Sequence, residues 1–359
     1  MTGNIGEWSE LYTMFKLLAD GKLYAADENT NRIPDIYYDV LKIIRGTNAD
    51  KLEYLRESDI KVVNAATGET VCSVPVQSFI EQTDFLLNKL YEKKKAKTKG
   101  AFEIQESYDF AKSIQCNTLK AKSSDKSDIV LMVHDIMSGR DDTFGFSIKS
   151  QLGSPSTLFN ASGSTNFTFK LKGNRLSDSE IEQFHEFKKF SDKFDYLKSL
   201  GTDIEFIETD NKTLEFNLKM VTSEMPLIFA EMIKNYYQGK SSMLSELIDI
   251  ISETGIVNTL DNKTYLAHNI KDLLTNIALG MVPNTLWTGN YEATGGYIIV
   301  KDDGDVVCYH IYNRNAFRNY MLKNTRFDTP SKSKHGFGYI YDVDGEQYIK
   351  LNVQIRFIK

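Results

Sequence analysis

Apolar and polar positions near the start of the chain repeat with the spacing of a helix. Between residues 6 and 20 the large apolar side chains recur every three or four positions, as on one face of a helix. Gly21 follows this stretch and is typical of a helix C-terminus. A second helix is predicted over residues 76–91, and we interpret the lysine-rich stretch 92–100 after it as a flexible basic linker. Between these helices, residues 59–64 alternate as a short strand does.

The pattern changes to that of strands in the middle of the chain. DIVLMVHDI (128–136) and TFGFSIKSQLG (143–153) are rich in Val, Ile, Leu and Phe. The polar, Gly-containing segment MSGRDD separates them, so the pair predicts a β-hairpin. A loop of small polar residues is expected over 153–166.

The remaining segments divide into helices and then strands. Helices are predicted at about 178–200, 224–237, 241–253 and 263–279, and the chain is β-rich after Trp287, with a basic loop at 323–338 set among the strands. We expect an α/β protein with a central mixed sheet flanked by helices and with added helical and C-terminal β-rich parts. The expected parts are 1–100 (helical), 101–225 (core with the hairpin), 226–285 (helical) and 286–359 (β-rich).

Composition excludes several classes of protein. Cys72, Cys116 and Cys308 are far apart, which supports neither a zinc ribbon nor a disulfide framework. We find no signal peptide and no apolar run of the roughly 20 residues needed to cross a membrane, so we expect a cytoplasmic protein. The net charge of −6 argues against a uniformly basic nucleic-acid-binding surface, but a basic cleft remains compatible with it.

The predicted hairpin gathers polar side chains at its open end. With the turn centred on residues 138–139, Asp128 lies opposite Lys149, and directly opposed residues share a face of the sheet. Ser147 and Gln151 lie two residues on either side of Lys149 and share that face.

Other carboxylates compete for a role at this site. Asp125 precedes the first strand and is an alternative to Asp128. Asp135 and Asp142 are expected to oppose each other near the turn on the other face, where we interpret them as solvated turn residues.

Phosphodiester hydrolysis requires such a set of groups. A carboxylate binds a hard divalent cation, which stabilises charge and activates water, and a lysine stabilises the transition state. The arrangement resembles the PD-(D/E)xK nucleases, except that Ser147 stands in place of the middle acid. In a variant of that superfamily an acid from another element supplements SxK, and Glu10 on the N-terminal helix is the candidate here. The alternative is that Glu10 lies on the solvent face of its helix.

Three segments resemble the HpaII family of type II restriction endonucleases. They are GEWSELYTMFKLLADGKLYAAD near the start, SDIVLMVHDI with GFSIKSQLGSPSTLFNAS in the middle, and NTRFDTPSKSKHGFGYIY with YIKLNVQIRF near the end. The resemblance implies a PD-(D/E)xK-like fold, dependence on Mg²⁺, and cleavage of double-stranded DNA at CCGG. By position it carries Asp128, Ser147, Lys149 and Gln151 into the nuclease motif.

A G·C-rich site predicts basic side chains at the DNA. Arg326 is the first candidate for a guanine contact, because its planar fork matches the guanine acceptors. The other candidates in the basic loop are Ser331, Ser333, Lys332, Lys334 and His335, with the lysines expected at phosphates. Ser154 and Asn160, in the 153–166 loop, are candidates for phosphate contacts. The alternative is that both loops are solvated surface.

Cleavage of both strands of a palindrome favours a two-fold homodimer. A different enzyme acting on DNA and a non-enzymatic DNA-binding protein are the alternatives. A methyltransferase needs a glycine-rich cofactor loop, which the chain lacks, so no organic cofactor is expected. A DNA-binding protein without cleavage activity remains the alternative, but the presence of both Asp128 and Lys149 argues against it.

Overall fold

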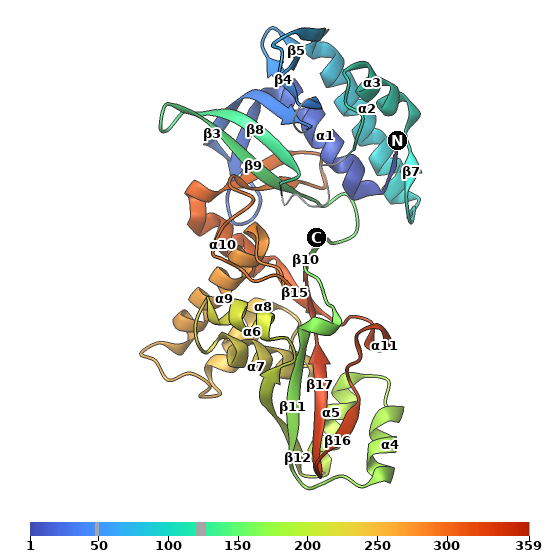
Figure 1. The fold of residues 1–359 in the computed structure, drawn as a ribbon, viewed down its shortest axis with the longest axis vertical. Coiled ribbons are helices and arrows are strands. Elements are labelled where there is room, and N and C mark those ends of the chain that lie inside the picture. Colours follow the sequence, from blue (N-terminus) through green and yellow to red (C-terminus); the bar gives the residue numbers. More distant parts are fainter. Residues whose placement is uncertain (47–49, 120–126, 359) are drawn as a thin grey trace. The chain divides into compact units, whose positions relative to one another are not determined.

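The computed structural model describes residues 1–46, 50–119 and 127–358, which form two compact units (Figure 1). Unit 1 consists of residues 1–156 and 291–320, and unit 2 consists of residues 157–290 and 321–358. The chain therefore leaves unit 1, builds most of unit 2, returns, and ends in unit 2. The four consecutive parts expected from the sequence do not coincide with these units, since the last of them contributes strands to both. Asp125 lies outside the described residues.

Unit 1 begins with the predicted helix, α1 (Ile5–Asp20). Asn4 caps its N-terminus through the backbone N–H of Glu7, while the Glu7 side chain accepts from the backbone N–H of Asn4. Gly21 ends the helix at φ 68°, a conformation that favours glycine. The end at Gly21 confirms the predicted C-terminus of the helix, whereas the cap at Asn4 was not predicted from the sequence.

A nine-stranded mixed sheet forms the centre of unit 1. In spatial order its strands are β2 (Lys22–Ala26), β14 (Val306–His310), β13 (Gly296–Val300), β9 (Arg140–Ser150), β8 (Ile129–Asp135), β3 (Arg32–Arg45), β4 (Leu52–Arg56), β5 (Asp59–Asn64) and β6 (Thr70–Pro75). The pairs β13–β9 and β14–β2 are parallel, and the remaining pairs are antiparallel. The expected central mixed sheet with flanking helices is therefore present.

The expectation that residues 1–100 are helical was wrong in large part. This stretch contributes two helices but also five strands of the central sheet, β2 to β6. The sequence of β3 does not show the regular alternation of a strand. The strand contains Pro34, and its pairing with β8 shifts in register between Val40 and Lys42. Such a shift breaks the simple alternation by which a strand is recognised.

Helices cover both faces of the sheet. The apolar core contains side chains of α1, α2 (Val76–Lys95) and α3 (Gln105–Ser113), together with Phe146 and Ile148 of β9. On the other face, Phe317 of α10 (Arg314–Lys323) packs against Tyr297 of β13. The helix α2 extends through Lys95, so the first part of the expected basic linker is helical. A short pair, β1 (Thr2–Gly3) and β7 (Phe102–Glu103), joins the chain start to the segment before α3.

Unit 2 combines two small sheets with a group of helices. One sheet has the order β12 (Thr202–Thr209), β11 (Asn166–Gly173), β17 (Glu346–Asn352), β16 (Ile340–Val343), and the other has the order β10 (Thr157–Phe159), β18 (Gln354–Phe357), β15 (Thr325–Asp328). Its helices are α4 (Asp178–Glu186), α5 (Phe190–Ser199), α6 (Lys212–Lys219), α7 (Met225–Tyr237), α8 (Leu244–Ser252), α9 (Asn262–Leu279) and α11 (Lys332–His335). Aromatic side chains fill its interior, among them Phe167, Phe229 and Phe327.

The region 178–200, expected as one helical region, is two helices. The backbone becomes extended at Phe187, which follows α4, and it is still extended at Lys189, which precedes α5. Within the described ranges, no helix has the length and apolar character needed to cross a membrane.

A buried histidine ends β14 in unit 1. His310 is 0% exposed, and its ring lies 4.8 Å from that of Tyr38 and 4.7 Å from that of Phe144 between ring centres. Its Nδ1 accepts a hydrogen bond from the backbone N–H of Tyr312 at 3.1 Å, so the neutral ring carries its proton on Nε2. Burial lowers the pKa of His310 to about 4.

This histidine predicts a loss of stability in mild acid. As the pH falls below about 6.5, the unfolded chain binds a proton that the folded protein does not, so the free energy of unfolding should decrease by about 1.4 kcal/mol per pH unit until pH 4 is approached. Urea unfolding at pH 6.5 and pH 5 measures this decrease. In His310→Phe the decrease should be smaller by about 2 kcal/mol. Equal decreases in the two proteins would contradict the prediction.

Candidate active site

The central hairpin forms as predicted, but its register differs by two residues. Asp135 pairs with Arg140 and Ile129 pairs with Phe146, which places Asp128 beside Ser147 instead of Lys149. The backbone N–H of Asp128 continues the ladder by donating to Phe146 O at 2.8 Å. A shift of two residues preserves the side-chain faces, so the expected polar group still forms.

Asp128, Ser147 and Lys149 are joined by a chain of hydrogen bonds. Oδ2 of Asp128 accepts from Ser147 Oγ at 3.0 Å and from the backbone N–H of Ile148 at 2.7 Å. Lys149 Nζ in turn donates to Ser147 Oγ at 3.0 Å. The serine is 5% exposed, while Asp128 and Lys149 are half-buried. Serine thus occupies the place of an acid and links the carboxylate to the ammonium group.

Tyr297 lies next to these hydrogen-bonded residues, and it was not among the predicted site residues. It lies in β13, in parallel register with Ser147, and Lys149 Nζ lies 5.2 Å from the centre of its ring. Burial raises the pKa of the Tyr297 phenol, and the nearby Asp128 carboxylate raises it further. The segment GGYIIVKD predicted a strand, but only the pairing of β13 with β9 brings the tyrosine to the lysine.

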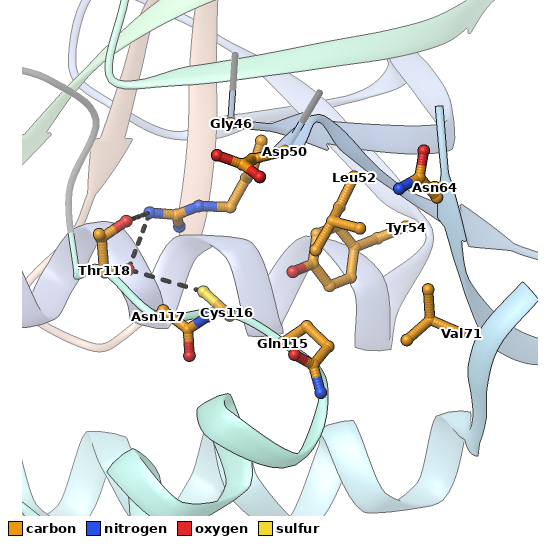
Figure 2. A pocket seen from close by; sticks show the side chains of 11 residues that line it. Gly46, Asp50, Leu52, Tyr54, Asn64, Val71, Gln115, Cys116, Asn117 and Thr118 are labelled. Atoms are coloured by element: carbon orange, nitrogen blue, oxygen red, sulfur yellow. Dashed lines mark hydrogen bonds between the residues drawn. The ribbon is translucent and has the colours of Figure 1, made fainter. Parts of the chain in front are cut away.

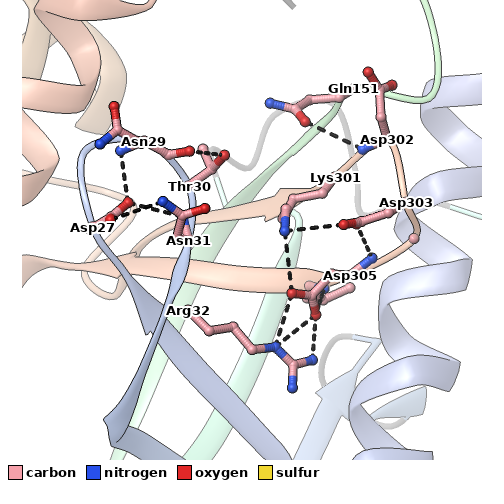
Figure 3. A network of polar contacts seen from close by, with 12 residues as sticks. Asp27, Asn29, Thr30, Asn31, Arg32, Gln151, Lys301, Asp302, Asp303 and Asp305 are labelled. Atoms are coloured by element: carbon pink, nitrogen blue, oxygen red, sulfur yellow. Dashed lines mark hydrogen bonds and ion pairs between the residues drawn. The ribbon is translucent and has the colours of Figure 1, made fainter.

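Gln151 ties the end of β9 to the turn between β13 and β14 (Figure 3). Its backbone N–H donates to Val300 O at 2.8 Å, and its Oε1 accepts from the backbone N–H of Asp302 at 3.3 Å. Lys94 donates to Gln151 O at 3.2 Å and pairs with Asp302 at 2.6 Å. The hydrogen bonds of Gln151 therefore support the strand end and go to neither Asp128 nor Lys149.

The helix that carries Glu10 meets β9 at the end of the strand. Ser9 Oγ and Ser150 Oγ are hydrogen-bonded at 2.8 Å, and these serines flank Glu10 and Lys149 in the sequence. By the alternation of the strand, the Ser150 side chain lies on the face opposite to Ser147 and Lys149. Glu10 itself is half-buried.

The donor set is compatible with Mg²⁺. Within the described ranges, no group of three or more His, Cys, Asp or Glu side chains is placed to hold a metal ion. Mg²⁺ keeps several waters and commonly takes only one or two protein carboxylates together with substrate phosphates. In the described part of the chain, Oδ1 of Asp128 has no hydrogen bond, since both bonds to the carboxylate go to Oδ2. Asp128 can therefore serve as one ligand.

Asp135 differs from its expected role. It does not oppose Asp142, which pairs with Val133, and it is buried and not solvated. Its carboxylate accepts from the backbone N–H of Met137 at 2.9 Å and so stabilises the turn.

The basic segment in unit 2 is ordered structure and not a simple loop. Arg326 lies in β15, directly opposite Arg356 of β18, and is half-buried. Lys332, Lys334 and His335 form the short helix α11, which Ser331 precedes. The pairing of β15 with β18 forms a strand within the segment that was expected to be a basic loop.

The expected 153–166 loop is divided between the units. Ser154 is exposed in unit 1 and follows β9, whereas Asn160 is exposed in unit 2 and follows β10. The strand β10 within this stretch pairs with β18. A separate hollow in unit 1 is lined by residues such as Arg45, Asp50 and Tyr54 (Figure 2) and by none of the predicted site residues.

These features define an α/β protein whose central hairpin presents an acid, a serine and a lysine at its open end. The family model of the HpaII restriction endonuclease matches residues 4–357. The chain is 41% identical to the type II restriction enzyme HpaII of Haemophilus parainfluenzae over 359 residues, which cover 99% of each protein. No solved structure matches it. The chain belongs to the HpaII restriction endonuclease family.

The hydrogen-bonded chain predicts the effect of Ser147→Ala. Loss of Oγ removes the link between Asp128 and Lys149, so we expect the rate of DNA cleavage to fall by about 10- to 100-fold, as for other groups that orient a metal ligand. Single-turnover cleavage of a short duplex measures the rate. Thr143→Ala, on an exposed part of the same strand, is the control and should retain the wild-type rate. An unchanged rate in Ser147→Ala would show that the link is not used.

Proposed function

We propose that this protein hydrolyses both strands of duplex DNA at CCGG, with Mg²⁺ as its cofactor, leaving 5′-phosphate ends. The main support is the hydrogen-bonded group Asp128–Ser147–Lys149 at the open end of the hairpin. The protein is also 41% identical over its length to a type II restriction enzyme. We assign unit 1 to the PD-(D/E)xK nucleases, with Ser147 in place of the middle acid.

Each residue of the hydrogen-bonded group has a distinct role in this mechanism. When bound, Mg²⁺ stabilises charge on the phosphoryl oxygens and lowers the pKa of the attacking water. Asp128 would hold the metal ion through its carboxylate, and Ser147 and the backbone N–H of Ile148 fix Oδ2 in place. Lys149 orients the water and stabilises the negative charge that develops on the phosphate. The ring of Tyr297 lies 5.2 Å from Lys149 Nζ and stabilises the ammonium group by a cation–π contact.

Glu10 is proposed as the second carboxylate of the metal site. The Ser9–Ser150 hydrogen bond holds this turn of α1 at the end of β9, next to Lys149 in sequence. Because Ser147 stands where the motif usually has an acid, one metal-binding carboxylate is missing from the hairpin, and Glu10 would supply it.

Recognition is assigned to the basic residues of unit 2. Arg326 is proposed to contact guanine, while Lys332, Lys334, His335 and Ser331 are proposed to contact the DNA backbone together with Ser154 and Asn160. A palindromic site favours a homodimer in which each subunit cuts one strand. The place of action is the cytoplasm, where the DNA to be cleaved is encountered.

Lys149→Ala tests the cleavage chemistry. We expect binding of a CCGG duplex to persist and the cleavage rate to fall at least about 100-fold, because a group that stabilises the transition state is lost. Plasmid DNA with Mg²⁺, and with EDTA in its place, measures cleavage, and sequencing of the fragment ends gives the site. Lys95→Ala, an exposed lysine at the end of α2, is the control. Wild-type turnover in Lys149→Ala would refute the site, and a wild-type protein that shifts DNA without cutting it would favour a DNA-binding protein.

Glu10→Gln tests the second metal ligand separately. The amide preserves size but removes the charge, so we expect a slower reaction and a half-saturating Mg²⁺ concentration raised about 10-fold or more. A titration of the cleavage rate against Mg²⁺ measures both effects. Glu106→Gln, an exposed acid in the first turn of α3, should behave as wild type. The same Mg²⁺ dependence in Glu10→Gln and wild type would remove Glu10 from the site.

A further inference from the structure

A groove in unit 2 lies where the α4–α5 linker meets the segment that leads into α11. It has a volume of about 490 Å³. Lys188 and Lys189 of the linker line it together with Lys332, and the aromatic rings of Phe190 and Tyr236 form part of its wall. The three lysines come from segments more than a hundred residues apart in the chain, so the fold alone brings them together.

The charged residues among the described lining of the groove are all lysines. Of the described residues that line it, none is acidic, and in the described part of the chain none of its three lysines forms an ion pair. Other lysines of unit 2 are paired, for example Lys170 with Glu346 at 3.0 Å and Lys350 with Asp210 at 2.6 Å.

Two other hollows of the molecule differ in charge. The lining of the hollow in unit 1 includes both Arg45 and Asp50. A second hollow in unit 2 includes Asp195 and Asp203 among its lysines. Mixed charge of this kind does not select for an anion, whereas the described lining of the groove at Lys332 contains lysines and no acidic residue.

The charge of Lys332 also contributes to lowered pKa values of two neighbouring residues. Lys193 lies beneath this region and is 1% exposed, and burial together with the charge of Lys332 lowers its pKa to about 8. Burial, Lys193 and Lys332 also lower the pKa of His185. A nearby carboxylate, Asp328, accepts from Gln354 at 2.8 Å and pairs with Arg356 at 3.3 Å.

The aromatic wall holds one of the cations in place. Lys332 Nζ lies 5.4 Å from the centre of the Phe190 ring, which packs against Tyr237 at 4.3 Å between ring centres. The hydroxyl groups of Tyr236 and Thr329 are hydrogen-bonded at 2.8 Å. Lys188 and Lys189, which also line the groove, are exposed.

We propose that this groove binds phosphates of the DNA backbone, with Lys188, Lys189 and Lys332 as the cationic contacts. The inference rests on the proposed function, and it adds a sequence-independent contact from a segment that the sequence analysis did not single out. Lysine suits this role because an ammonium group contacts phosphate as a point charge and does not read bases. The contact should strengthen binding equally for duplexes with and without CCGG.

The double variant Lys188→Gln/Lys189→Gln tests the groove through the salt dependence of binding. Each phosphate contact contributes about 0.9 to the slope of log K against log salt, so the slope should become shallower by about 1.8. At 0.1 M salt the same relation gives a roughly tenfold loss of affinity for each lysine. Binding is measured in EDTA by fluorescence anisotropy on two labelled duplexes, one with CCGG and one without. Lys198→Gln, an exposed lysine at the other end of α5, is the control for surface charge.

The outcomes separate the groove from the enzymatic function. Shallower slopes and equal losses on both duplexes, with Lys198→Gln close to wild type, would support the groove. Wild-type slopes in the double variant would overturn it, as would a loss confined to the CCGG duplex or an equal loss in the control. Cleavage of plasmid DNA by the wild-type protein is scored in parallel with Mg²⁺. If the wild type binds but does not cut, the enzymatic proposal fails while the binding data still decide the groove.

Discussion

The pairing of β8 with β9 is the constraint on which the site depends. It places Asp128 beside Ser147, so that one carboxylate oxygen is held by the Ser147 hydroxyl and the Ile148 N–H. The serine then holds the ammonium group of Lys149. A slip of one residue in this pairing would turn Asp128 to the opposite face from Ser147 and Lys149, so the hairpin register determines whether the site exists.

The rest of unit 1 supports this pairing from both faces. On one side, Phe146 and Ile148 of β9 pack into the core with α1, and the Ser9–Ser150 hydrogen bond fixes the helix against the strand end. On the other side, Tyr297 of the parallel neighbour β13 lies beneath Lys149. Side chains that alternate along β9 thus serve stability on one face and chemistry on the other.

Unit 2 presents a different use of charge. Lys170 and Lys350 of unit 2 are paired with carboxylates, whereas in the described part of the chain Lys188, Lys189 and Lys332, which line the groove, form no ion pair. This distribution explains how a protein with a net charge of −6 remains compatible with a polyanionic substrate. The total charge describes the whole chain, whereas DNA responds to the local field of one face.

The sequence by itself determined the helix α1 with its end at Gly21, the central hairpin, and the shared face of Asp128, Ser147 and Lys149. These features depend on local periodicity and capping, which the order of residues encodes directly. Only the tertiary structure decided the two-residue shift of the hairpin, the strands of residues 22–75, the approach of Tyr297 to Lys149, and the meeting of Lys188 with Lys332. These features arise from pairing and packing between segments far apart in the chain, and no local pattern specifies which distant partner a strand or loop will find.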